Sequence, residues 1–265
     1  MAFGPSLNLQ EERAMEKNTF EVIILIGRPA AGKSEVIDYL KKVPLEERIE
    51  RFHIGAFQEI DDFPILWERF EDDDLMEEMG QPRLLTDREF TYEGKTMPGH
   101  VFKGKWFWNF LIKKLNLAYG KLLRDDPAFH ERKTLFIEFA RGQEHGGFRE
   151  AFSFLSPQVL DHAAALYIKV DWPESLRKNR RRYNPDRPDS ILQHALEDKK
   201  IEMLYKESDW EEFASDPKYL PAGERKVPYA VFENMPEKTD KPDVLGAHLQ
   251  EVLGLLWQTW RGVKP

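Results

Sequence analysis

The stretch that decides the fold is Phe20–Leu40, which reads FEVIILI, GRPAAGKS and EVIDYL in succession. Its first part, Phe20–Ile26, is an apolar run rich in β-branched residues, which is typical of a buried strand. The middle part, Gly27–Ser34, has the spacing G-x-x-x-x-G-K-S. The last part carries apolar residues at helical spacing. The stretch therefore predicts a strand, a glycine-flanked loop and a helix in immediate succession.

The loop has the composition of a phosphate-binding site. Gly27 and Gly32 let the backbone curl so that N–H groups point at phosphate oxygens, and the following helix directs its positive end at the same anion. Lys33 would then bridge the terminal phosphates, and Ser34 would place its hydroxyl on Mg²⁺. A glycine turn that binds nothing would leave Lys33 at the helix start unexplained. We expect the nucleotide to be bound by Gly27, Arg28, Pro29, Ala30, Ala31, Gly32, Lys33, Ser34 and Glu35.

Composition restricts the class of protein. The chain has 265 residues, of which 41% are hydrophobic and 32% charged, as in globular proteins that bury a core. It contains no apolar run long enough for a bilayer, and Met1–Lys17 is polar and acidic where a signal needs an apolar centre, so we expect a cytoplasmic protein with no membrane partner. Without cysteine there is no disulfide framework. The net charge of −8 argues against a nucleic acid partner but allows a small anion in a local basic pocket. The oligomeric state is not indicated.

Four further apolar segments alternate with helical patterns along the chain. Such a βαβ series predicts a parallel sheet with right-handed crossovers, here a three-layer α/β sandwich with five parallel strands. We expect one domain over 19–265 after a mobile tail at 1–18, with an insertion of short helices and loops at about 65–105 that could contain a hairpin at Glu93–Gly94. The further strands are expected within 51–60 and at 134–139, 163–170 and 227–232. The helices are expected at 33–42, 106–123, 147–154, 174–183, 191–206 and 244–260.

The strand order and the Gly27–Ser34 loop resemble the P-loop kinases of small molecules, the group that contains nucleoside monophosphate, shikimate and gluconate kinases. The likeness covers the five strands and their loops but not the 65–105 insertion, and only the loop is strongly specific. It implies the P-loop NTPase fold with the loop after the first strand. It also implies MgATP as phosphoryl donor and an arginine-rich lid, which would lie at about 174–190.

Acidic residues follow the second and third strands. The resemblance implies that Asp61 and Asp62, at the end of the second strand, hold the acceptor or its metal. A carboxylate near a magnesium nucleotide would also qualify as general base for a hydroxyl acceptor. The alternative is that the pair caps a helix that starts at Phe63–Pro64. After the third strand, the resemblance implies that Glu138, where the family more often has aspartate, supports the magnesium ion beside Ser34.

Arginines occur at two places in the same scheme. Arg141, three residues after Glu138, could grip an acceptor phosphate or carboxylate beside Asp62, and the alternative is a surface salt bridge. In the lid implied by the resemblance, Arg177 and Arg181 lie at helical spacing, and arginines that close over a moving phosphoryl group stabilise its charge. The alternative is a solvated basic face or a nucleic acid contact. Further candidates in this segment are Arg180, Arg182 and Arg187.

The sequence thus predicts a transfer of the γ-phosphoryl group of MgATP to a small hydroxyl or phosphate acceptor. One alternative is a P-loop ATPase or nucleotide-dependent switch. The absence of N-K-x-D where Asp171-Trp172-Pro173 stands counts against a GTPase but not against an ATPase. The other alternative is a polynucleotide or protein-modifying kinase. The acceptor itself cannot be read, because specificity lies in the insertion. The residues expected to be catalytic are Lys33, Asp61, Asp62, Arg177 and Arg181.

Overall fold

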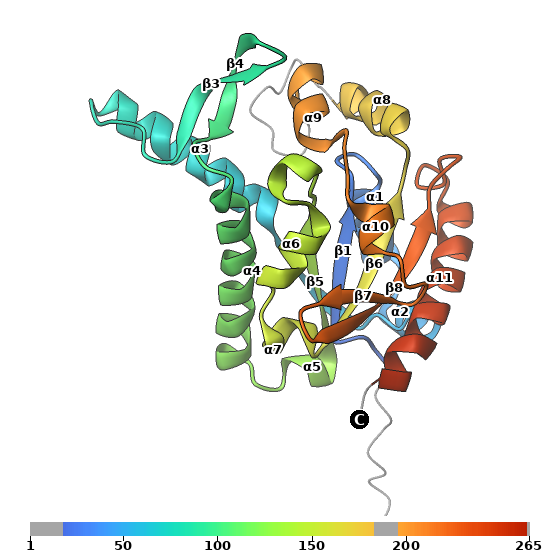
Figure 1. Cartoon of the computed structure of the whole chain (residues 1–265). Helices are drawn as coiled ribbons and strands as arrows, with labels where there is room; N and C mark the ends of the chain where they lie inside the picture. The colour runs from blue at the N-terminus through green and yellow to red at the C-terminus, as the bar shows by residue number, and fades with distance from the viewer. Residues whose placement is uncertain (1–17, 183–195, 264–265) are drawn as a thin grey trace, which may run out of the picture.

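The computed structural model describes residues 18–182 and 196–263, and Figure 1 shows a central sheet with helices on both faces. The strands of this sheet are β1 (Val22–Gly27), β2 (Ala56–Asp61), β5 (Lys133–Phe139), β6 (Ala163–Lys169), β7 (Tyr219–Ala222) and β8 (Arg225–Glu233). Their order across the sheet is β2-β5-β1-β6-β8-β7. All neighbours run parallel except β7, which is antiparallel to β8. The chain therefore has a three-layer α/β fold with a mostly parallel sheet.

The five expected strands are present and parallel, but the prediction of a five-stranded sheet is wrong because β7 adds a sixth. This edge strand has four residues. It contains Pro221, which cannot donate a ladder hydrogen bond and is confined to sheet edges. Gly223, with φ of 63°, supplies the turn into β8. So short a strand has too little alternation to be read from the sequence.

The helices form two layers, one on each face of the sheet. Successive side chains of a strand point to opposite faces, so Ile23 and Leu25 face one layer while Ile24 and Ile26 face the other. The first layer contains α1 (Lys33–Lys42), α2 (Leu45–Phe52) and α11 (Pro242–Val263). The second contains α4 (Trp106–Asp125), α5 (Phe129–Arg132), α6 (Gly147–Phe154), α7 (Pro157–Leu160) and α10 (Trp210–Phe213). Both faces of β1 are thus buried, as its apolar sequence predicts.

Helix α2 was not expected, and it delays the second strand to Ala56. Its sequence is mostly charged, yet Arg48 and Phe52 are buried. The guanidinium of Arg48 donates to the carbonyls of Leu40 at 2.8 Å and Gly55 at 3.1 Å, and so fastens the end of α1 to the start of β2. A buried arginine that satisfies backbone carbonyls gives no apolar signal in the sequence.

The insertion differs in part from its prediction. A single helix of 17 residues, α3 (Asp62–Glu78), replaces the expected short helices and begins before residue 65. The hairpin at Glu93–Gly94 is confirmed, since β3 (Thr86–Tyr92) pairs antiparallel with β4 (Lys95–Phe102). Figure 1 shows this hairpin standing beside α3 and away from the central sheet. Long helices are hard to read where acidic residues interrupt the apolar pattern.

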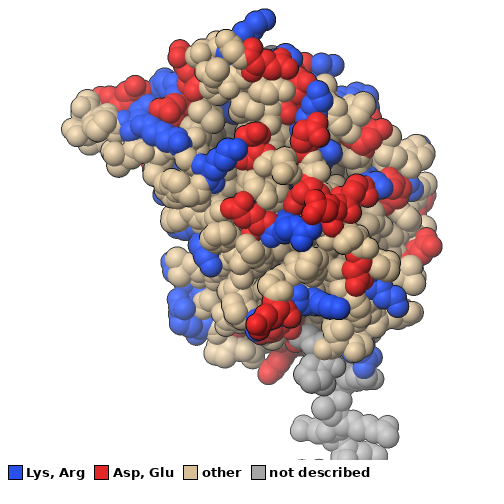
Figure 2. Space-filling model, in the orientation of Figure 1, with Lys and Arg blue, Asp and Glu red and all other residues tan. Residues whose placement is uncertain are grey.

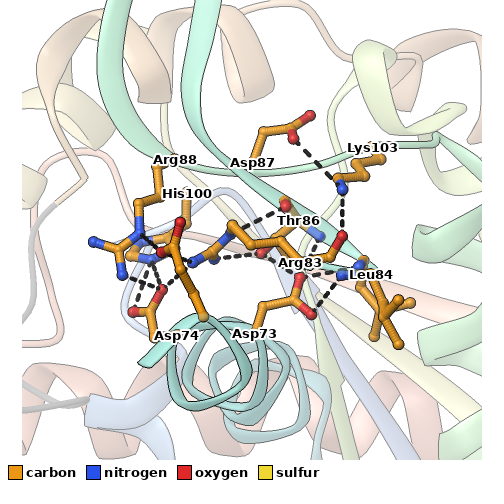
Figure 3. Close-up of polar contacts among 11 residues, drawn as sticks. Asp73, Asp74, Arg83, Leu84, Thr86, Asp87, Arg88, His100 and Lys103 are labelled. Atoms are coloured by element: carbon orange, nitrogen blue, oxygen red, sulfur yellow. Dashed lines mark hydrogen bonds and ion pairs between the residues drawn. The ribbon is translucent and has the colours of Figure 1, made fainter. Parts of the chain in front are cut away.

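Asp73 holds the segment before the hairpin to α3, as Figure 3 shows. This carboxylate is 1% exposed and accepts hydrogen bonds from the backbone N–H groups of Leu84, Leu85 and Thr86 and from the Thr86 hydroxyl. Burial acts to raise the pKa of Asp73, but these hydrogen bonds outweigh it and leave the pKa below its usual range. The orientation of the hairpin therefore depends on one buried anion.

Two observations concern partners. None of the helices in the described residues combines the length and the apolar character that a membrane crossing requires. On the face shown in Figure 2, acidic and basic side chains are interspersed, without a broad basic surface.

Two further helices complete the end of the molecule near the Gly27–Ser34 loop. They are α8 (Trp172–Arg182) and α9 (Asp198–Tyr205), and a short 3-10 turn spans Gln143–His145. Residues 183–195, with Arg187 and part of the expected lid, lie outside the described residues, as does the tail at 1–17.

Candidate functional site

The loop between β1 and α1 requires its two glycines. A Cβ at Gly27 would lie 2.6 Å from the carbonyl oxygen of Ile168 in β6. Gly32 has φ of +115°, and a Cβ there would lie 2.8 Å from Thr239 Cγ2. The left-handed backbone and the close approach of neighbouring segments both exclude a side chain. The loop is therefore curled and tightly packed at its two ends.

Neighbouring elements fix the loop from three sides. The Asn234 amide, just after β8, donates to the carbonyl of Ala31 at 2.8 Å. The Ser175 hydroxyl in α8 donates to the carbonyl of Pro29 at 2.8 Å. The guanidinium of Arg28 donates to backbone carbonyls at the end of α9. The first two contacts satisfy the loop carbonyls of Ala31 and Pro29, and the third ties the loop to the end of α9.

Lys33 and Ser34 begin α1 and face polar partners. Lys33 is 7% exposed, and its ammonium lies 3.7 Å from a carboxylate oxygen of Glu138. The Ser34 hydroxyl accepts a long hydrogen bond of 3.4 Å from the guanidinium of Arg182. The structure thus brings together Lys33, Ser34 and Glu138, which the sequence grouped, and adds Arg182.

The acids come from the carboxyl ends of adjacent strands. Asp61 in β2 lies opposite Glu138 in β5 in the sheet register. One Asp61 oxygen accepts from the backbone N–H of Phe63 at 3.0 Å and so caps α3. Asp62 is 5% exposed and forms an ion pair of 2.6 Å with Arg141. Asp61 therefore has the capping role that the sequence left open, and it also lines a cavity beside Glu138.

Burial perturbs the acids of this site. Burial, together with the charges of Glu138 and Asp62, raises the pKa of Asp61 from 3.8 to about 8. Burial also raises the pKa of Glu138, although the ammonium of Lys33 opposes that shift. Carboxyl groups with raised pKa values that face one cavity are typical of sites that accept a proton or a cation.

The interior position of Arg141 corrects the alternative of a surface salt bridge. Arg141 is 2% exposed, and its guanidinium lies 5.3 Å from the centre of the Trp108 ring. Besides Asp62, it donates to the carbonyls of Ala140 at 2.7 Å and of Trp108 at 3.1 Å. Most of its donors are thus occupied within the protein, so Arg141 chiefly positions Asp62.

A first cavity of about 170 Å³ opens beside the loop and is walled by the ends of β2 and β5, α8 and α9. Arg182 and Asn179 of α8 reach it. Arg177 does not; it pairs instead with Glu174 and Glu237. The charged and hydroxyl side chains along its wall are Lys33, Ser34, Asp61, Asp62, Glu138, Arg141, Arg182 and Tyr205.

A second cavity of about 310 Å³ lies on the other side of the loop. Glu35 of α1 and Arg181 of α8 line it, while Ala30 and Arg182 line both cavities. Gly27, Arg28, Ala31 and Gly32 line neither and act through the shape and anchoring of the loop. The remaining residues around the second cavity are Lys178, Glu237, Thr239 and Asp240.

Several of these residues were missed by sequence reasoning. Asn179 and Lys178 lie on the same face of α8 as Arg182, at a spacing of three and four residues. That face also carries Ser175, and all but Arg182 are buried. The sequence signal was therefore the helical spacing of these polar residues, but the neighbouring arginines drew the prediction to Arg177 and Arg181 instead.

The described residues contain no group of three or more His, Cys, Asp or Glu side chains arranged as a metal cage. A magnesium ion bound with a nucleotide commonly takes one or two protein ligands, together with water and phosphate oxygens. Ser34 and Glu138, which both line the first cavity, are oxygen donors of that kind. The raised pKa of Glu138 also fits a position where a cation would relieve buried negative charge.

Comparisons with known proteins add little. No family model and no curated protein sequence matches the chain. A solved structure titled "Crystal structure of APE1195" is 12% identical, and the likeness covers 89% of this chain and 98% of that chain with a TM-score of 0.36. A TM-score of this size assigns neither a fold nor a function. The functional inference therefore rests on the residues of this chain.

Proposed function

We propose that the protein is a P-loop kinase, which transfers the γ-phosphoryl group of MgATP to a small acceptor. The observation that carries this proposal is the pair of cavities that meet at the loop, because Ala30 and Arg182 line both. A reaction between two substrates needs two adjoining pockets with the reacting groups at their junction. The second cavity would take the nucleoside of the donor, and the first would take the acceptor.

The phosphate chain would lie along the loop between the cavities. Lys33 would bind the terminal phosphates, since its buried ammonium has only the longer contacts to Glu138 and to a loop carbonyl. Arg182 would approach the group in transfer and stabilise its charge. Ser34 and Glu138 would hold Mg²⁺, which when bound neutralises the phosphate oxygens.

Asp61 is the proposed general base for a hydroxyl acceptor. Burial raises the pKa of Asp61 to about 8, close to neutral pH. Such a pKa suits a group that must accept a proton as the acceptor oxygen attacks. The proton would move from the acceptor hydroxyl to the Asp61 carboxylate. Asp62, fixed by Arg141, would accept a hydrogen bond from the acceptor and orient it.

The walls of the first cavity favour a small acceptor over a polynucleotide or protein. The cavity is about 170 Å³, below the roughly 300 Å³ at which pockets for drug-sized ligands begin. Nucleic acids also require a basic surface, which Figure 2 does not show on the face in view. These observations support transfer to a small molecule.

A screen of ATP consumption tests the proposal. The purified protein is incubated with MgATP and with nucleosides, nucleotides, sugars and small hydroxy acids, and ADP formation is measured. One or more acceptors should raise the rate above the basal hydrolysis. Lys33→Ala should abolish that rate, whereas Lys42→Ala, at the exposed far end of α1, should not.

Circular dichroism and thermal melting establish that both variants fold. Acceptor-dependent turnover that survives in folded Lys33→Ala would contradict the proposal. Hydrolysis that no acceptor stimulates, but that Lys33→Ala abolishes, would favour an ATPase or switch instead.

A further inference from the structure

A third cavity, of about 140 Å³, adjoins the first one and extends it toward the insertion. The two cavities share Phe63 and Leu66 of α3 and Leu196, which precedes α9. Beyond these residues the wall is largely aromatic, with Trp67 and Phe70 at helical spacing along the same face of α3. The continuity of the walls makes the third cavity an apolar extension of the proposed acceptor pocket.

Lys200 of α9 lines the third cavity and is 9% exposed. Its ammonium donates to the carbonyl of His100 in β4. It also lies 5.5 Å from the centre of the Phe70 ring and 6.0 Å from that of Phe90. Within residues 18–182 and 196–263, no carboxylate forms an ion pair with this ammonium. Among the described residues, Lys200 is therefore a buried cation without a paired anion.

The neighbouring acids do not compensate this charge. Glu197 lies on the same cavity wall without forming an ion pair with Lys200. Asp74, shown in Figure 3, already contacts Arg83, Arg88 and His100. Burial accordingly lowers the pKa of Lys200 from 10.5 to about 8, with only a partial opposing effect of Glu197. An anionic group that entered the cavity would pair with the Lys200 ammonium and so offset the desolvation penalty of this buried charge.

We infer that the acceptor is an amphiphilic hydroxy acid, whose hydroxyl lies beside Asp61 and whose carboxylate binds the ammonium of Lys200. Its apolar body would cross between Phe63 and Leu66 on one side and Leu196 on the other. The hydroxyl end of this inference rests on the proposed phosphoryl transfer. The carboxylate end rests on the third cavity alone.

A carboxylate fits this cavity better than a phosphate does. Lys200 is the one lysine or arginine among the described residues that line it. A single cation neutralises a monoanion, whereas a dianionic phosphate would leave surplus negative charge beside Glu197. Many phosphate sites also use a bidentate arginine, and no arginine is among the described residues that line this cavity.

Ligand binding without nucleotide tests the carboxylate end by itself. The probes are ω-hydroxybutanoate, ω-hydroxyhexanoate, ω-hydroxydecanoate and hydroxymethylbenzoate, each compared with its methyl ester. Thermal melting and tryptophan fluorescence report binding, since Trp67 lines the cavity. At least one acid should bind the native protein about 10-fold or more tightly than its ester. Equal affinity of acids and esters, or no binding of any acid, would overturn the inference.

Variants at adjacent lysines identify the cation. Lys200→Met should remove the preference for acid over ester, and Lys200→Arg should retain most of it. The matched control is Lys199→Met, because Lys199 is exposed and pairs with Glu93 and Glu202. A folded Lys200→Met protein that still prefers the acid would contradict the inference.

The kinase assay separates this inference from the proposed function. In one outcome, an acid binds through Lys200, but the native protein and Asp61→Asn hydrolyse ATP at equal rates that no acceptor changes. That outcome would support the carboxylate site and contradict the proposed phosphoryl transfer. If transfer occurs only to acceptors without a carboxylate and Lys200→Met does not affect it, the kinase stands and the hydroxy acid is excluded.

Discussion

At the scale of single residues, Asp61 combines a structural and a chemical role. One oxygen caps α3 through the N–H of Phe63, and the carboxyl faces the first cavity beside Glu138. Asparagine caps helices about as well as aspartate but cannot act as a base, whereas alanine does neither. Two substitutions at this position can therefore separate the roles.

We predict that Asp61→Asn preserves the cap of α3 but lowers kcat by about 10²–10⁴-fold, because the proton acceptor is lost. Asp61→Ala should lower kcat equally, and its free energy of unfolding should be about 0.5–2 kcal/mol below that of Asp61→Asn because the cap is lost. Urea denaturation and steady-state kinetics measure the two effects. Near-native kcat in Asp61→Asn would exclude Asp61 as the base.

The raised pKa of Asp61 predicts a dependence of stability on pH in the metal-free protein. The folded state holds the Asp61 proton up to about pH 8, while the unfolded chain releases it near 3.8. The contribution of this group to stability is thus fully present below about pH 4 and is lost as the pH rises through about 8. Relative to the native protein, Asp61→Asn should gain stability between about pH 5 and pH 9. Urea melts with EDTA measure this, and a constant difference would contradict it.

At the scale of elements, the phase of α8 decides which arginine reaches the loop. The face with Ser175, Asn179 and Arg182 turns toward the loop, and Arg177 turns outward into pairs with Glu174 and Glu237. The sequence singled out Arg177 and Arg181 from the lid position that the family resemblance implies and from their helical spacing. The packing of α8 assigns the contact with the loop to Arg182 instead.

We therefore predict unequal effects of two similar substitutions. Arg182→Gln should lower kcat by at least about 10²-fold, since arginines at the group in transfer contribute about 10³–10⁵. Arg177→Gln removes the two ion pairs of an exposed side chain, with Glu174 and Glu237, and should change kcat by less than about threefold. Steady-state kinetics with saturating ATP compare them. A larger loss of kcat in Arg177→Gln than in Arg182→Gln would contradict this prediction and support Arg177 as the catalytic arginine.

Asp73 of α3 anchors the segment that leads into the β3–β4 hairpin. We predict that Asp73→Ala lowers the free energy of unfolding by about 2–4 kcal/mol, because buried N–H groups of Leu84, Leu85 and Thr86 lose their acceptor. The exposed neighbour Asp72 is the matched control, and its change to alanine should cost less than about 1 kcal/mol. Urea denaturation measures both. Equal losses would show that the anchor is not specific.

At the scale of the whole molecule, two cavities lie at the loop. A substitution in one cavity should therefore change the binding of one substrate and not of the other. Arg181 lines the second cavity and not the first. Arg181→Gln should raise the KM for ATP several-fold, by about 1 kcal/mol of binding, and leave the KM for the acceptor unchanged. Initial rates with each substrate varied in turn measure the effect. An effect on the acceptor alone would reverse the assignment of the cavities.

Much of the framework could be predicted from the sequence. The Phe20–Ile26 strand, the glycine loop, α1 and the turn at Glu93–Gly94 all depend on residues close together in the chain, and the structure contains each of them. The meeting of Lys33 and Glu138 was implied by the family resemblance, and the structure has β1 and β5 as neighbours in the sheet. Strand β7 and helix α2 were missed because edge strands and charged helices carry weak periodic signals.

The amino-acid sequence alone specifies the strand, loop and helix at residues 20–40 and the acids at the strand ends, because spacing between near neighbours encodes backbone conformation. Only the tertiary structure decided that Arg182 reaches Ser34, that Arg141 is buried against Asp62, and that Lys200 ends an apolar extension of the first cavity. Those contacts join residues from distant segments. They depend on helix phase and side-chain packing, which no local pattern specifies.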